Sequence, residues 1–126
     1  MAPPASPPDL ASQVRAHGPS AQLVSVSPEG RPHVVAVLVE AGDAAAGLVV
    51  APGSTTRTNV ATNPAVTLLW PPAPGSDHSL MVDGTAAVAG DTVTIAPTSA
   101  LLHRAAHAPE DVPRCLAVEV PATSPT

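Results

Sequence analysis

Short apolar runs, rich in β-branched residues and bounded by glycine, proline or other turn residues, recur along most of this chain of 126 residues. Runs of this length and composition predict β-strands. We expect strands at residues 22–27, 32–40, 48–51, 65–70, 79–89, 92–96 and 115–120. Six or seven mostly antiparallel strands in so small a chain favour a closed or partly closed barrel, because closure removes exposed strand edges.

Turn residues predict how these strands are connected. Pro28-Glu29-Gly30 and Gly90-Asp91 are each expected to close a hairpin, and Gly84 interrupts its strand as a β-bulge does. A further turn over 42–47 would make the first three strands an antiparallel meander. The run over 65–70 is apolar throughout, which predicts a strand buried on both faces or nearly so.

Three short helices are expected between the strands. Their ranges are 10–17, 55–62 and 100–107, and each follows a residue that can cap a helix, namely Asp9, Ser54 and Ser99. Each range is also followed closely by glycine or proline, which ends a helix.

The core must be built almost without aromatic side chains, because the chain has no Phe, no Tyr and a single Trp, Trp70. Aliphatic side chains bury less area than aromatic ones, at about 25 cal/mol per Å2, so a monomer of this size would be marginally stable. We therefore expect a homodimer in which a second copy covers one sheet face. Trp70 is expected in the core or in that interface.

Charge and cysteine content limit the partners and the compartment. Charged residues make up 12% of the chain and the net charge is −5, which argues against nucleic acid or an anionic membrane as partner. No segment reads as membrane-spanning, and the N-terminus lacks the regions of a signal peptide. Cys115 has no partner for an internal disulfide, so we expect a cytoplasmic protein in which this residue is an inert small hydrophobe.

The segment Leu48–Trp70 carries the strongest functional indication. At the start of its expected helix, the hydroxyls of Ser54, Thr55 and Thr56 and free backbone N–H groups would converge, with Arg57 one residue further on. Unsatisfied N–H groups at a helix N-terminus favour an anion, so a phosphate would fit here. A capped surface helix whose threonines bond only to water explains the same residues equally well.

Three segments, taken in order, carry a resemblance: they are SVSPEGRPHVVAV, VVAPGSTTRTNVATNPAVTLLW and LMVDGTAAV. Together they resemble the pyridoxamine 5′-phosphate oxidase-like family of flavin-binding split barrels, over roughly Gln22 to Pro97. The resemblance implies a mainly β fold with short helices, a split β-barrel in one domain over 9–121. A disordered Pro-rich leader over 1–8 would precede it, and a tail over 122–126 would follow. It also implies a homodimer with FMN or the deazaflavin F420 at the subunit interface.

The resemblance points to particular cofactor contacts. The strand matching 31–37 would run beside the ring system, which makes Arg31, His33 and Val35 candidate contacts, and Ser54 matches the family's loop serine at the phosphate.

One departure from the family pattern falls at the phosphate. The two positions after Ser54 are typically an Arg-Lys pair in flavin-binding members but are Thr55 and Thr56 here, which removes two charge-assisted bonds of about 1.5–3 kcal/mol each. Arg57 is placed to compensate in part for the two lost bonds. The alternative phosphate ligand is Arg31 or Arg104, which could reach the phosphate from the strand or from the partner chain.

The function implied is an FMN- or F420-dependent oxidoreductase acting on an unknown small conjugated substrate. The cofactor ring would carry the redox chemistry, so no catalytic side chain is demanded. Two alternatives stay open: a non-enzymatic dimeric protein that binds flavin or another ligand, and a barrel that has lost its cofactor.

His103 and His107 lie one turn apart in the third expected helix, which is the spacing of two metal ligands. No cysteine lies near them and no third ligand is evident, so we expect solvent-facing histidines and no metal site.

Overall fold

The computed structural model describes residues 8–41, 47–106 and 108–121. Within them, two α-helices and seven strands follow the order α1 (Leu10–His17), β1 (Ser20–Val26), β2 (Pro32–Leu38), β3 (Leu48–Val50), α2 (Ser54–Thr62), β4 (Ala65–Trp70), β5 (His78–Ala89), β6 (Thr92–Arg104) and β7 (Cys115–Val118). The mainly β fold with short helices is confirmed. The leader over 1–7, the turn over 42–46, His107 and the tail over 122–126 lie outside the described residues.

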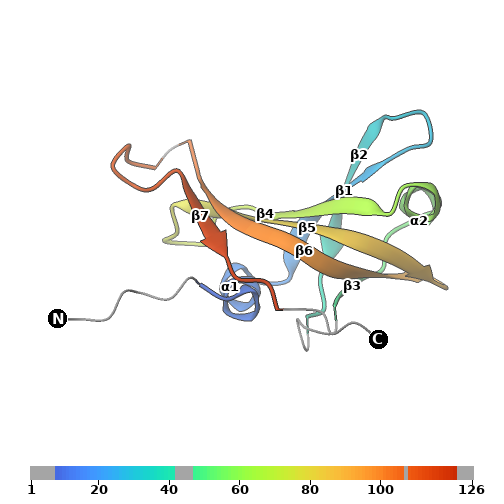
Figure 1. The fold of residues 1–126 in the computed structure, drawn as a ribbon, viewed down its shortest axis with the longest axis horizontal. Helices are drawn as coiled ribbons and strands as arrows, with labels where there is room; N and C mark the ends of the chain where they lie inside the picture. The colour runs from blue at the N-terminus through green and yellow to red at the C-terminus, as the bar shows by residue number, and fades with distance from the viewer. Residues whose placement is uncertain (1–7, 42–46, 107, 122–126) are drawn as a thin grey trace.

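The strands form one antiparallel sheet in the order β2-β1-β4-β5-β6-β3, with β7 pairing on β6 as well (Figure 1). The outer edge of the long strand β6 is divided, since residues 93–95 pair with β3 and residues 100–103 pair with β7. Glu40 and Val49 exchange both backbone hydrogen bonds, at 2.9 Å each, which joins the chain after β2 to β3. This bridge links the two ends of the sheet order and closes one part of the barrel.

The expected meander of the first three strands is wrong. The β1–β2 hairpin forms around the turn at 27–31, but β3 leaves it and pairs with β6, touching the β2 side only through the Glu40–Val49 bridge. β1 instead pairs with β4 on its other side. Local patterning identifies strands but not their non-local partners, which depend on the closure of the whole barrel.

The expected third helix is also wrong, because residues 99–104 continue β6. Each of these residues pairs with β5, from Asp83 opposite Ser99 to His78 opposite Arg104. Ser99 caps nothing; its hydroxyl donates to the Asp83 carboxylate at 3.3 Å. Two neighbouring strands therefore override the helix propensity of this Ala- and Leu-rich stretch.

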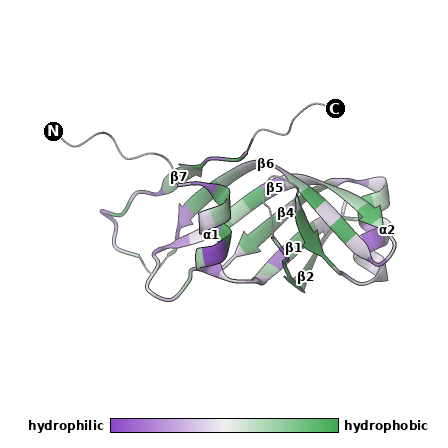
Figure 2. Ribbon diagram, turned by 90° about the horizontal axis from the view of Figure 1, so that it is seen from below, coloured by the Kyte–Doolittle hydropathy of each residue, from purple (hydrophilic) through white to green (hydrophobic). Residues whose placement is uncertain are grey.

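The N-terminal helix forms as predicted. The Asp9 carboxylate accepts from the backbone N–H of Ser12 at 2.7 Å, and Gly18 ends the helix with φ +86°. Leu10 and Val14 are buried and join the sheet core. Figure 2 shows α1 lying across one face of the sheet.

The core lies on the sheet face that α1 covers. Its largest fully buried side chains include Leu23, Leu68, Leu80 and Trp70, and the Trp70 indole N–H donates to the carbonyl of Gly18 at 2.8 Å. The core placement of Trp70 is confirmed. β4 is not buried on both faces as expected, because its side chains alternate between buried and partly or fully exposed.

The opposite face, called here the outer sheet face, carries both apolar and polar side chains and has no helix over it within the described residues. Direct cross-strand pairs form two rows on it, one of Val34, Val24, Thr67, Asp83 and Ser99 and the other of Ala36, Gln22, Leu69, Met81 and Leu101. Val34 is 57% exposed and Leu38, at the end of the same strand, is 69% exposed. Exposed apolar side chains gathered on the edge strand of a sheet are a feature of interaction surfaces.

A polar cluster lies in the middle of this face. The Thr67 hydroxyl donates to the Asp83 carboxylate at 2.6 Å, and the Ser99 hydroxyl donates to its second oxygen. Next to it, the β5–β6 register shifts between Asp83 and Gly84, so an irregularity lies where Gly84 predicted one, but the extra residue is Thr98 on β6 rather than a residue of β5.

Candidate functional site

The first turn of α2 leaves backbone donors free. Gly53, with an extended backbone, takes the N-cap position, and no side chain caps the helix. The expectation that Ser54 is the cap is therefore wrong: Ser54 is the first helical residue and is exposed. Because the first N–H groups of an α-helix have no partner within it, those of Ser54, Thr55 and Thr56 remain available to an anion.

The three hydroxyls of this turn do not converge. Ser54 and Thr55 are exposed, but Thr56 is 1% exposed and turned into the protein. Its Oγ1 is the one buried side-chain polar atom without a hydrogen-bond partner among the described residues. A buried unpaired hydroxyl costs stability, and in native proteins it commonly marks a bound water or ligand.

Arg57 folds back over the loop that precedes the helix. Its Nη1 donates to the carbonyl of Pro52 at 2.7 Å, and the side chain is half-buried. The guanidinium therefore lies on the N-terminal side of its own helix, and four of its five N–H donors are left for other partners.

Two asparagines fasten α2 to the first hairpin. Asn59 donates to the hydroxyl of Ser25 at 3.2 Å, and both residues are buried. Asn63 donates to the carbonyls of Val26 and Ser27. Sequence reasoning missed this attachment, and the only signal for it was asparagine, a poor helix former, inside and after the helix.

The hairpin carries Arg31, His33 and Val35, and its turn is held at the C-terminal end of α2. Arg31 is exposed in the turn, next to the segment that Asn63 holds. His33 and Val35 are half-buried on the inner side of β2, and His33 lies opposite Ser25. Since α2 has nine residues and rises about 1.5 Å per residue, the Arg31 turn lies about one helix length from Ser54 within one protomer.

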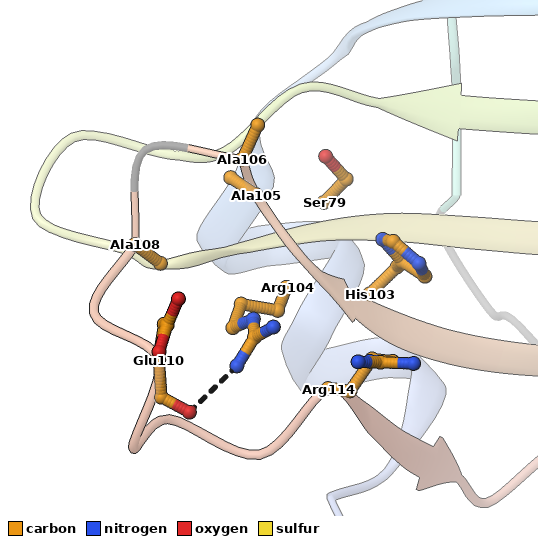
Figure 3. Close-up of a pocket in the computed structure, with 8 residues that line it drawn as sticks. All are labelled: Ser79, His103, Arg104, Ala105, Ala106, Ala108, Glu110 and Arg114. Carbon is orange, nitrogen blue, oxygen red and sulfur yellow. Dashed lines mark hydrogen bonds between the residues drawn. The ribbon is translucent and has the colours of Figure 1, made fainter.

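Arg104, the other candidate phosphate ligand, is at the opposite end of the sheet. Its Nη1 donates to the carbonyls of Glu110 and Val112 at 2.7 and 3.1 Å, so it fastens the loop before β7 (Figure 3). Figure 1 shows this loop and α2 at opposite ends of the sheet.

Of the two histidines expected on a helix, His103 lies on β6 and is exposed, and His107 is outside the described residues. Among the described residues, no three His, Cys, Asp or Glu side chains gather closely enough to hold a metal ion. Cys115 begins β7, but it is exposed rather than packed as a small hydrophobe. In the described part of the chain, no helix is long and apolar enough to cross a membrane.

Comparison with known proteins gives relatives in both sequence and structure. No family model matches the chain. Uncharacterised proteins of Mycobacterium bovis and Mycobacterium tuberculosis are each 39% identical over 104 residues, covering 68% of this chain and 71% of the relative.

Solved structures share the fold at low identity. An F420 reductase has a TM-score of 0.56 and 18% identity over 68% of this chain and 91% of its own. A Clostridium acetobutylicum protein of the pyridoxinephosphate oxidase family, related to general stress protein 26, has a TM-score of 0.61 and 10% identity over 75% and 85%. HutZ, the heme storage protein of Vibrio cholerae, has a TM-score of 0.55 and 14% identity over 71% and 91%. Their shared architecture is the split barrel.

Proposed function

We propose that this chain, which has the split-barrel fold, belongs to the pyridoxamine 5′-phosphate oxidase-like family and is a homodimeric oxidoreductase that binds FMN or F420 and acts on a small conjugated substrate. The observation that carries this proposal is the uncapped first turn of α2 beside Arg57. It combines free backbone donors, the positive end of a helix dipole and a guanidinium in one place.

The residues of this turn fit a phosphate group by their donor chemistry. The N–H groups of Ser54 and Thr55 and their exposed hydroxyls are neutral donors, and Arg57 adds one positive charge. The buried, unpaired hydroxyl of Thr56 fits a site whose partner is a ligand or a water. Because the Thr56 side chain is buried, a lysine at this position would point into the protein and bury its charge. The phosphate would therefore be held mainly by neutral donors in this chain.

The outer sheet face supports the homodimer. Val34 and Leu38 expose most of their side chains on a strand of the first hairpin, and Leu69, Met81 and Leu101 lie half-buried on the same face. A second copy covering this face would remove it from water and compensate for the aromatic-poor core. The same hairpin carries the exposed Arg31 in its turn, so dimerisation is the step that would bring this residue of one protomer to a shared site.

Bound FMN or F420 would supply electron or hydride transfer through its ring system. The protein's own residues would bind and orient it. The first turn of α2 and Arg57 would hold the phosphate, while the half-buried His33 and Val35 would restrict water beside the ring. We also place the protein in the cytoplasm, where the exposed thiol of Cys115 stays reduced.

A second candidate is a non-enzymatic ligand-binding protein, which includes a barrel without any cofactor. The replacement of the family's basic pair by Thr55 and Thr56 favours it, and a heme storage protein is among the structures that share the fold. Visible absorbance of the purified protein and the mass of any copurifying molecule distinguish the two candidates.

The proposal is tested by titrating FMN and F420 into matched variants. Arg57→Ala should weaken binding about tenfold or more, the effect of one charge-assisted hydrogen bond, and Thr55→Arg should tighten it because this position is exposed. Arg31→Ala tests the alternative phosphate ligand in the hairpin turn. Loss of binding in Arg31→Ala with parent affinity in Arg57→Ala would move the phosphate to the hairpin and contradict the proposed seat.

A further inference from the structure

One edge of β2 lies open at the rim of the sheet. Among the described residues, β2 pairs along its length with β1 alone, and the chain meets another strand only just after β2, where Glu40 bridges to Val49 of β3. Figure 2 shows β2 at the margin of the sheet. An edge strand carries a row of backbone N–H and C=O groups that are free to pair with another strand.

The register of the β1–β2 hairpin shows which backbone groups face this edge. The backbone N–H of Val39 donates to the β1 side at 2.8 Å, so residues of β2 with odd numbers bond to β1. Bonding alternates along an antiparallel strand, so the backbone groups of the even-numbered residues point away from β1. Glu40 follows this alternation, since its N–H and C=O both bond to Val49 at 2.9 Å. The residues whose groups face the open edge are Val34, Ala36 and Leu38.

The open edge is bounded at both ends. Pro32, which begins β2, has no N–H to donate, and the backbone groups of Glu40 are already used by Val49. A partner strand therefore has three consecutive edge-facing residues to pair with. Beside the bridge, β2 and β3 part around a hollow of about 280 Å3 that Leu38 and Ala51 line, which leaves room for the end of such a strand.

This edge is complementary to a second copy of itself. In an antiparallel pair of two β2 strands centred on Ala36, Val34 of each copy lies opposite Leu38 of the other, and the two Ala36 residues face each other. All three edge-facing residues of each copy then exchange both backbone hydrogen bonds with their partners. The small Ala36 side chain at the two-fold axis allows close approach, and the exposed side chains of Val34 and Leu38 cover each other.

Charge at the ends of the edge favours the same arrangement. Arg31 precedes one end and Glu40 follows the other, and both side chains are exposed. An antiparallel pair centred on Ala36 places Pro32 opposite Glu40 of the other copy, so Arg31 comes within reach of that carboxylate at both ends of the pair. A parallel pair would instead bring like charges together.

We propose that a second copy of this chain pairs with the open edge of β2 as an antiparallel strand, with a two-fold axis at Ala36. The contact goes beyond the proposed cofactor function. It also differs from the covering of the outer sheet face, because it uses backbone groups that lie in the plane of the sheet. Three residues on each side make a small interface, so the pairing is weak and depends on protein concentration.

The first test is amide hydrogen exchange on the 15N-labelled full chain, without FMN, at about 0.5 mM and at about 0.02 mM protein. Pairing predicts that exchange at Val34, Ala36 and Leu38 is about threefold or more slower at the higher concentration. Val35 and Val37 already bond to β1, so they are internal controls and should change little. A copy that covers the outer sheet face would not produce this alternation along the strand.

Two variants of similar size at one position test the backbone bonds. Ala36→Pro removes the N–H at the two-fold axis and Ala36→Val keeps it, and neither removes a bond to β1 because this N–H faces the open edge. By sedimentation equilibrium, Ala36→Pro should weaken self-association about tenfold or more, whereas Ala36→Val should stay within about threefold of the parent. Thermal melting checks that Ala36→Pro stays folded.

Charge reversal supplies a measurement that does not depend on proline. Arg31→Glu should weaken self-association several-fold, since it places two carboxylates together at each end of the pair, and Glu40→Arg added to the same chain should restore it. Arg15→Glu reverses an exposed charge on α1, away from the edge, and is the control for net charge.

Three results would each overturn the proposal. The first is exchange at Val34, Ala36 and Leu38 that does not change with concentration. The second is equal self-association of a folded Ala36→Pro and Ala36→Val. The third is an equal loss in Arg31→Glu and Arg15→Glu, which would show an effect of net charge alone. A copy bound on the outer sheet face would remain in Ala36→Pro, so the failure of one contact is distinguished from the failure of the other.

Discussion

Gly84→Ala should destabilise the barrel although it adds a single methyl group. An ideal Cβ at Gly84 would lie 2.6 Å from Cγ2 of Ile95 and 2.8 Å from the carbonyl oxygen of Ala96, whereas ordinary contacts begin near 3.4 Å. The Ile95 side chain is fully buried, and the Ala96 carbonyl belongs to β6, so neither can retreat without moving the β5–β6 pair.

The magnitude follows from two opposing terms. Overpacking of this kind costs about 1–3 kcal/mol, and the lower entropy of alanine in the unfolded chain returns about 0.4–1 kcal/mol. We expect a net loss of about 1–2 kcal/mol in the free energy of unfolding, measured by urea denaturation with an unchanged slope. Thr85→Ala, at the exposed neighbouring position, is the control and should change stability by about 0.5 kcal/mol or less. A Gly84→Ala protein as stable as the parent would refute the close packing of β5 on β6 at the bulge.

Three further predictions concern stability. Trp70→Phe should lose about 2 kcal/mol or more in denaturant unfolding, because the indole fills the core and bonds to Gly18; a loss below about 0.5 kcal/mol would contradict that placement. Ser25→Ala should cost about 1–3 kcal/mol by leaving the buried Asn59 amide unpaired, and Ser25→Thr, which keeps the hydroxyl, is its comparison. The hydrogen bond from the backbone N–H of Ser12 holds the pKa of the Asp9 carboxyl below its usual 3.8 in the folded protein. The ionised Asp9 therefore stabilises the fold fully above pH 3.8, and this stabilisation is lost as the pH falls through the lowered pKa of the folded state. The melting-temperature gap between the parent and Asp9→Ala should therefore be largest near neutral pH and narrow under acid, and a constant gap would argue against the charged cap.

Local sequence patterns predicted most of the elements because the physics of those elements is local. The first helix begins after the side-chain cap of Asp9 and ends at Gly18, which has a positive φ. Both signals can be predicted from neighbouring residues. The irregularity at Gly84 was predicted for a similar reason, although its cause, the close approach of β6, was not visible in the sequence.

The failures come from non-local pairing. Residues 99–104 have good helix formers, yet they form a strand because β5 lies on one side and β7 on the other. The same extension moved His103 and Arg104 from a supposed helix to the end of a sheet, beside Arg114. No spacing rule connects residues 79, 103 and 115, so their side-by-side placement on three strands could be found only after the strands were paired.

At the candidate cofactor site, the sequence correctly located a helix start but not the directions of its side chains. The turn residues Pro52 and Gly53 predicted the break before α2, whereas the inward turn of Thr56 and the return of Arg57 to Pro52 depend on how the helix packs on β1 and β5. These contacts decide which groups remain available to a phosphate.

The most direct test of the central claim compares the affinities of the parent protein for FMN and for riboflavin, which has the same ring system but no phosphate. Both are measured by the quenching of flavin fluorescence, and F420 is titrated in parallel. A phosphate seated at the first turn of α2 predicts that FMN binds at least about tenfold more tightly than riboflavin, and that Arg57→Ala reduces this ratio. Equal affinities for FMN and riboflavin, or no binding of FMN or F420 at about 100 μM, would contradict the account.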